Sequence, residues 1–77
     1  MVLYNICMKM IEVFKTNVAE AEHADKLVAM LQQYFPGGRI TFDLEDCDRV
    51  LRVESTFVAA DSVIGLLRSH NYECYTL

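Results

Sequence analysis

The 77-residue sequence contains no cluster of basic residues and no long apolar segment. Acidic residues outnumber basic residues by 11 to 7, which gives a net charge of −4 at neutral pH. Nucleic acids and anionic membranes are bound mainly through basic patches, so both are poor candidate partners. The longest apolar runs span four or five residues, whereas a transmembrane helix needs roughly 20. The sequence therefore predicts no nucleic-acid partner and no membrane partner.

The patterns that carry common enzyme chemistry are also missing. There is no Gly-rich phosphate-binding loop and no nucleophile elbow, and Gly37-Gly38 closes a helical pattern instead of opening one. Neighbouring carboxylates occur in the polar segment 45–48, where water keeps them ionised. We therefore expect neither catalytic residues nor a bound cofactor.

The three cysteines, Cys7, Cys47 and Cys74, lie far apart in the sequence. An odd number of cysteines, in a chain whose start lacks the basic and long apolar regions of a secretion signal, argues against a disulfide framework. We expect reduced thiols and a cytoplasmic location. Cys47 is predicted to be accessible, and Cys74 is predicted to be a small buried hydrophobic residue.

The size and composition predict one domain over residues 1–77, with more apolar residues than a domain of this size can bury. A chain of this length buries about 60 to 65% of its unfolded surface, and 53% of the residues are hydrophobic. We expect part of this surface to be covered by another subunit.

Alternating residues predict a first strand over residues 8–15. If Met8, Met10 and Phe14 pointed into the core, Glu12 would point there with them. Ile11 and Val13 are therefore the expected core residues. Met8, Met10 and Phe14 are expected on the opposite face.

Two helical patterns follow. Asn17 and Glu20 have the spacing of a capping box, and an apolar stripe then predicts a helix over residues 18–34 that ends before Pro36-Gly37-Gly38. A second stripe is expected to begin after an N-cap at Ser55 or Thr56 and to end near Asn71, a residue suited to a left-handed conformation.

The remaining segments complete the fold. Residues 40–53 alternate around a polar turn and predict a β-hairpin, and residues 72–77 predict a short last strand. Strand, helix, hairpin, helix, strand is the ferredoxin-like βαββαβ order, an α+β fold. It predicts a four-stranded antiparallel sheet of order 4-1-3-2, with both helices on one face. Residues 1–7 fall outside this plan, as an extension of the first strand or an extra segment.

From Ile11 to Leu77 this order and spacing resemble the heavy-metal-associated domain of small copper chaperones and P-type ATPases. The hairpin FDLEDCDRVLRVE matches best. That family binds a soft cation such as Cu(I) through a Met-x-Cys-x-x-Cys loop between its first strand and first helix. Here residues 14–21 read FKTNVAEA and contain no cysteine. The resemblance implies the fold, in a divergent relative without the metal site of the family.

The sheet face away from the helices is the first candidate site. The predicted alternation gives it an apolar interface formed by Met8, Met10, Phe14, Val50, Tyr75 and Leu77. An antiparallel sheet face exposed to water should be polar, so an apolar face usually marks an interface. We expect a non-enzymatic module that acts through contacts with a protein partner or with a second copy, as a homodimer. The alternative is a mixed surface in which Glu12, Arg52 and Glu73 cover the apolar residues.

A second candidate function is a relocated metal site. The topology places Cys47, His70 and the acidic hairpin tip at one end of the sheet, with Asp46 and His23 close by. A thiolate, imidazoles and a carboxylate can together bind Zn²⁺ or Cu. The simpler alternative is a solvated acidic turn. A third possibility, a small molecule bound in a groove between subunits, rests on fold analogy alone.

Overall fold

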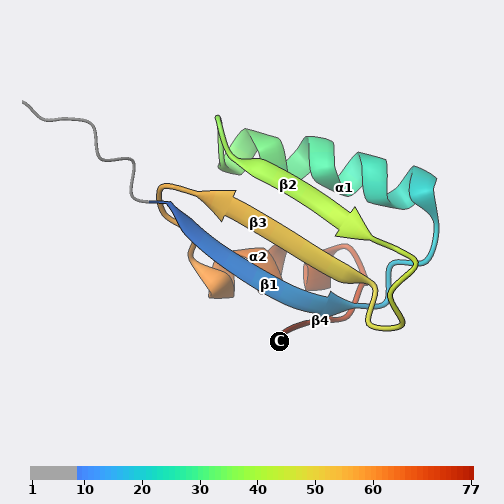
Figure 1. Cartoon of the computed structure of the whole chain (residues 1–77). Helices are drawn as coiled ribbons and strands as arrows, with labels where there is room; N and C mark the ends of the chain where they lie inside the picture. The colour runs from blue at the N-terminus through green and yellow to red at the C-terminus, as the bar shows by residue number, and fades with distance from the viewer. Residues whose placement is uncertain (1–8) are drawn as a thin grey trace, which may run out of the picture.

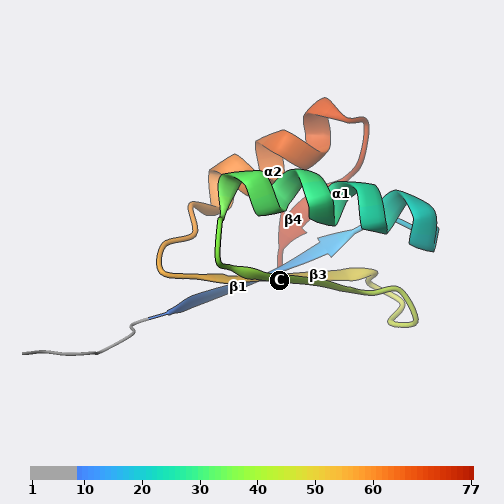
Figure 2. The ribbon, with the colours of Figure 1, turned by 90° about the horizontal axis from the view of Figure 1, so that it is seen from above.

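The computed structural model describes residues 9–77 and shows a two-layer α+β fold (Figure 1). The elements are β1 (Met10–Thr16), α1 (Ala21–Tyr34), β2 (Arg39–Asp43), β3 (Val50–Ser55), α2 (Ala60–Ser69) and β4 (Cys74–Thr76). The strands form one antiparallel sheet of order β2-β3-β1-β4, as expected for a ferredoxin-like fold. Both helices cover the same face of the sheet and leave the other face open (Figure 2). Neither helix is long and apolar enough to cross a bilayer.

The core lies between the helices and the covered face of the sheet. Apolar residues spaced three and four apart turn one side of each helix towards the strands, and alternate residues of each strand meet them. The side chains with the least exposure come from β1, α1, β3, α2, β4 and the first loop: Phe14, Val18, Leu31, Leu51, Val53, Val63, Leu67 and Cys74. The expected burial of Cys74 is thus confirmed.

The predicted orientation of β1 is wrong. Phe14 pairs directly with the buried Leu51, and Glu12 pairs with the buried Val53, so the even-numbered residues of β1 face the helices. Phe14 is fully buried, whereas Ile11 is 47% exposed on the open face.

The prediction was wrong because it excluded Glu12, a charged residue, from the face of the helices. β4 pairs with β1 only from Phe14 to Thr16. Glu12 therefore lies beyond the end of β4, where a half-buried side chain can extend its carboxylate past the sheet edge into water.

The loop after β1 is closed by hydrogen bonds that replace the predicted capping box. The Thr16 hydroxyl donates to the carbonyl of Arg49 (2.6 Å) and accepts from the N–H of Val18 (3.2 Å). The Asn17 side chain accepts from the N–H of Glu73 (2.8 Å), which ties the loop to the start of β4. The N-cap of α1 is Glu20, without a side-chain cap. Because Asn17 is held by β4, the helix begins three residues later than predicted.

The turns between the other elements follow the sequence signals more closely. Gly37 has φ +82°, and a Cβ on Gly38 would lie 2.8 Å from the carbonyl oxygen of Glu54, so glycine is required at the end of α1. Asn71 has the expected left-handed conformation, with φ 71°. The helix α2 begins after Ala59, later than the predicted Ser55 or Thr56, because Ser55 still belongs to β3.

Candidate interaction surface

The open face of the sheet is built from the odd-numbered residues of β1 and β2 and the even-numbered residues of β3. The register sets side chains opposite one another: Arg39 beside Glu54 beside Ile11, Thr41 beside Arg52 beside Val13, and Asp43 beside Val50. On the other side of β1, Lys15 lies opposite Tyr75, and Leu77 donates its N–H to the carbonyl of Val13 (3.0 Å).

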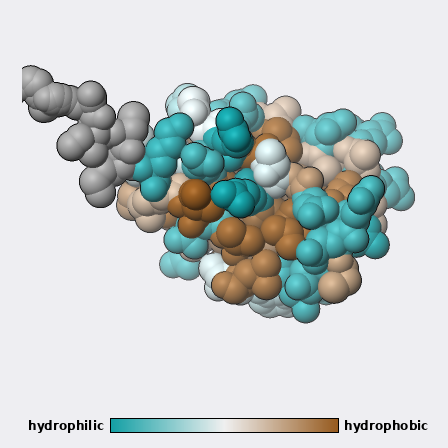
Figure 3. Space-filling model, in the orientation of Figure 1, coloured by the Kyte–Doolittle hydropathy of each residue, from teal (hydrophilic) through white to brown (hydrophobic). Residues whose placement is uncertain are grey.

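Four apolar side chains gather on the β1–β4 side of this face, and we call them the open-face strip: Ile11, Val13, Tyr75 and Leu77. Ile11, Tyr75 and Leu77 are 47, 49 and 64% exposed, and Val13 is half-buried. Figure 3 shows hydrophobic atoms grouped over β1 and the C-terminal strand, between hydrophilic groups. Water thus reaches large aliphatic side chains that β-structure normally buries.

Charged residues occupy the β2–β3 side of the same face. Arg39 and Asp43 are exposed at opposite ends of β2, and Glu54 and Arg52 lie on β3. The face is therefore divided along the strands into a half that is apolar apart from Lys15 and a half with mixed charges. Of the residues expected to cover the apolar side chains, Arg52 lies on this face opposite Val13, whereas Glu12 is on the face of the helices.

The backbone edge next to the open-face strip is also incomplete. β4 has three residues and reaches only the C-terminal half of β1. Among residues 9–77, no strand pairs with Met10–Glu12 on the β4 side. Backbone N–H and C=O groups at such an edge can pair with another chain.

The structure changes the membership of the predicted interface. Val50, Tyr75 and Leu77 lie on the open face as predicted, with Val50 half-buried, whereas Phe14 is in the core and Met10 belongs to the face covered by the helices. Met8 lies outside the described residues. Sequence reasoning missed Ile11 and Val13. The short last strand was the signal that would have identified them, because it leaves the N-terminal half of β1 uncovered and lets the carboxylate of Glu12 reach water.

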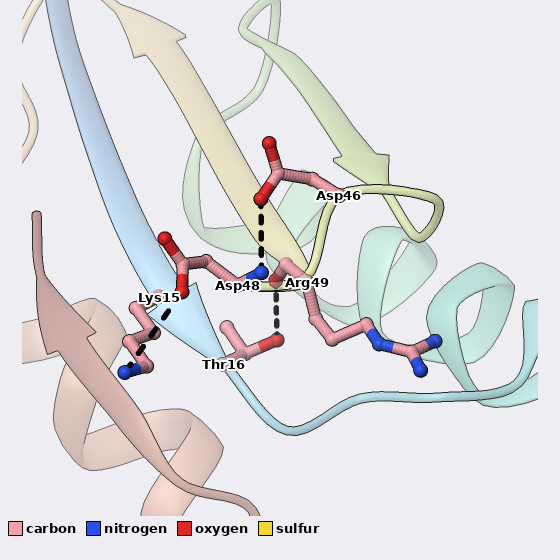
Figure 4. Close-up of polar contacts among 5 residues, drawn as sticks. All are labelled: Lys15, Thr16, Asp46, Asp48 and Arg49. Atoms are coloured by element: carbon pink, nitrogen blue, oxygen red, sulfur yellow. Dashed lines mark hydrogen bonds and ion pairs between the residues drawn. The ribbon is translucent and has the colours of Figure 1, made fainter.

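The hairpin tip brings Asp46, Cys47 and Asp48 together, with one potential ligand atom of each residue within 4.8 Å of the others. Figure 4 shows that the two carboxylates have internal roles. Asp46 accepts from the N–H of Asp48 (2.9 Å), and Asp48 lies 3.9 Å from the ammonium group of Lys15. Together with the bond from Thr16 to Arg49, these contacts shape the turn. Cys47 is exposed, as predicted.

The two histidines lie elsewhere within residues 9–77. His23 and His70 line a shallow hollow with Tyr72, and neither belongs to the group of potential ligands at the hairpin tip. His23 is in edge-on contact with Tyr72, with ring centroids 6.3 Å apart. Nδ1 of His70 lies 3.0 Å from the carbonyl oxygen of Leu66 at the end of α2. The imidazoles thus have structural contacts of their own.

The surroundings of the buried Cys74 thiol make it unreactive. Burial raises the pKa of Cys74 from 9.0 to about 11, and the charge of Arg68 lowers it by less. Arg68 also donates to the carbonyl of Cys74 (3.2 Å) and lies 5.1 Å from the ring centroid of Tyr75. It thereby holds one residue of the open-face strip in place.

No protein-family model, curated protein or solved structure matches this chain. The resemblance to the heavy-metal-associated domain therefore stays a prediction from the sequence. In the family the loop after the first strand binds the metal, and here Thr16 and Asn17 close this loop with hydrogen bonds. The open face presents large apolar side chains that the described fold leaves in water.

Proposed function

We propose that this chain is a non-enzymatic interaction module that self-associates through the open face of its sheet. The observation that carries this proposal is the open-face strip, in which Ile11, Tyr75 and Leu77 are about half exposed or more. Covering apolar surface is worth about 25 cal/mol for each Å². A second sheet packed on this face would remove the strip from water, as in the aligned packing of β-sandwiches.

The distribution of charge favours a second copy as the occupant. Arg39 and Asp43 lie at opposite ends of β2 on the same face. A two-fold axis that runs across the strands stacks the copies with strand directions reversed. Arg39 of each copy then lies over Asp43 of the other, while the two open-face strips meet. Arg39 and Asp43 are therefore complementary in charge across this axis and the apolar strips meet, whereas Arg52, beside Thr41, lies near its own copy at the axis.

The size of the face indicates a weak complex. Four strands about 4.8 Å apart and seven residues at about 3.3 Å each outline roughly 440 Å². A stable interface covers about 800 Å² on each partner. We therefore expect association in the micromolar range, about −6 to −8 kcal/mol, that depends on concentration.

A charge-swap experiment tests this arrangement. Arg39→Asp and Asp43→Arg each place like charges opposite one another twice in the dimer, so each should weaken association by about tenfold or more. The double variant restores opposite charges and should recover association to within about threefold of the original. Sedimentation equilibrium of the full chain measures all four dissociation constants.

The matched control uses exposed charges on the helical layer. Asp25→Lys and Lys26→Glu, on α1, change the net charge in the same directions and should leave the dissociation constant within about twofold. If the two single variants on β2 behave like these controls, the open face is not the interface. If the singles weaken association and the double variant remains weak, the proposed two-fold orientation is wrong.

The proposal places this module in the cytoplasm, where Cys47 and Cys74 remain thiols. Both are free, one on the surface and one in the core. It also treats the chain as a divergent relative of the heavy-metal-associated domain, in which a loop for metal binding has become a loop that locks β1, β3 and β4 together.

A further inference from the structure

A cavity of the described chain lies on the helical layer, at the end of the sheet far from the acidic tip. It measures about 460 Å³, within the range of small-molecule sites. The C-terminal end of α1, the end of β3 and the first turn of α2 enclose it. The residues that line it share a lack of formal charge: Tyr34, Phe35, Pro36, Ser55, Thr56, Phe57, Ala59, Ser62 and Leu66.

Two aromatic side chains border this cavity and are largely exposed. Tyr34 is 61% exposed and Phe57 is 66% exposed, although such residues usually bury most of their surface. Leu66 and Phe35 complete an apolar wall between them. An aromatic ring bound there would cover surface that the protein now leaves in water.

Ser55 supplies a polar group inside this apolar wall. It is only 8% exposed, and its hydroxyl makes no hydrogen bond with another residue of the segment 9–77. Ser55 lines the cavity, so a molecule bound there can pair with this hydroxyl. A polar group that a ligand covers needs a hydrogen-bond partner, so this hydroxyl favours a ligand that supplies one.

The first turn of α2 sets the charge of the ligand. Asp61 is exposed in the first turn of α2, where its carboxylate offsets the preference of a helix N-terminus for an anion. No basic side chain is available among the lining residues to bind a negative group. A cation would meet no acidic residue in the wall either. The chemistry of the cavity therefore suits an uncharged molecule.

We infer that this cavity binds a small, neutral aromatic molecule with one hydrogen-bonding group, held between Tyr34 and Phe57 and bonded to the Ser55 hydroxyl. Ser55 belongs to the buried face of β3, so this site lies on the other side of the sheet from the open face. It is independent of the proposed self-association. The cavity inference or the self-association proposal can each be wrong without affecting the other.

Indole and the neutral dye N-phenyl-1-naphthylamine serve as probes for the full chain. Dye fluorescence and amide chemical shifts should report saturable binding, with shifts at the end of β3 and the start of α2. Ser62→Trp fills the cavity from an exposed position on α2 and should weaken binding by at least about tenfold. Ser69→Trp, at the other end of the same helix and away from the cavity, is the matched control and should change it by less than about twofold.

Ser55→Ala separates the hydrogen bond from the apolar contacts. It should weaken indole, which has an N–H donor, by about threefold to tenfold, and should leave the carbon analogue indene unaffected. Absence of saturable binding of both probes would overturn the inference. Equal effects of Ser62→Trp and Ser69→Trp, or shifts confined to the open face, would overturn it as well.

Discussion

The orientation of β1 can be tested by comparing Phe14 with Ile11, because the sequence pattern and the structure assign these residues to opposite faces. Phe14 is fully buried against Leu51, and Ile11 is 47% exposed. Replacing a buried Phe by Ala costs about 3 to 5 kcal/mol, through lost burial and the cavity that remains. Ile11→Ala removes a half-exposed side chain and leaves no cavity, so we expect a cost of about 1 kcal/mol or less in the monomer.

The size of these effects sets the design of the experiment. A domain of 77 residues has an expected stability of about 4 to 12 kcal/mol. Phe14→Ala can remove most of this free energy of unfolding. Phe14→Leu, with an expected cost of about 1 to 2 kcal/mol, is therefore measured as well. Urea unfolding monitored by circular dichroism at about 1 µM protein keeps more than about half of the chain monomeric under the proposed affinity.

The opposite ranking would refute the reasoning. If Ile11→Ala lowers the free energy of unfolding by more than Phe14→Leu does, Ile11 is the core residue. The register of β1 would then be displaced by one residue, and the open-face strip would lose its members from that strand.

Three further predictions concern other parts of the fold. Gly38→Ala should lower stability by about 1 to 3 kcal/mol in urea unfolding, because its Cβ would lie 2.8 Å from the carbonyl oxygen of Glu54, and an unchanged midpoint would contradict the tight turn. Because burial raises the pKa of Cys74 to about 11, the stability that this thiol contributes is complete below pH 9 and is lost as the pH rises to 11. Cys74→Ala should reduce this loss of unfolding free energy by about 2 to 3 kcal/mol, and identical pH profiles of the two proteins would contradict the raised pKa. Native mass spectrometry with Zn²⁺ should show no stoichiometric ion, and one ion lost on Cys47→Ser or His70→Ala would restore the metal hypothesis.

The sequence predicts much of this fold because its signals are local. Gly37 and Asn71 mark positions that need a left-handed backbone, and alternation identifies the hairpin and its buried residues. These features follow from the conformational preferences of single residues. The strand order then follows from the connection rules.

The errors arise where a distant segment decides the structure. Asn17 accepts a hydrogen bond from Glu73, 56 residues away, so it does not cap α1. Glu12 can face the helices only because β4 is too short to cover it. The interface prediction inherited this error at Phe14 and Met10. Tyr75 and Leu77 do lie exposed on the open face, because their strand contains no such conflict.

The central claim is that the open face binds a second copy of this chain. Sedimentation velocity of the full chain from about 1 to 500 µM tests it directly, with Ile11→Lys as the comparison. The exposed half of Ile11 amounts to about 80 to 90 Å², or about 2 kcal/mol for each copy. We predict that the mass rises from 8.8 kDa towards twice that value, and that Ile11→Lys stays at 8.8 kDa. A mass of 8.8 kDa for the unmodified chain at the highest concentration would contradict the account.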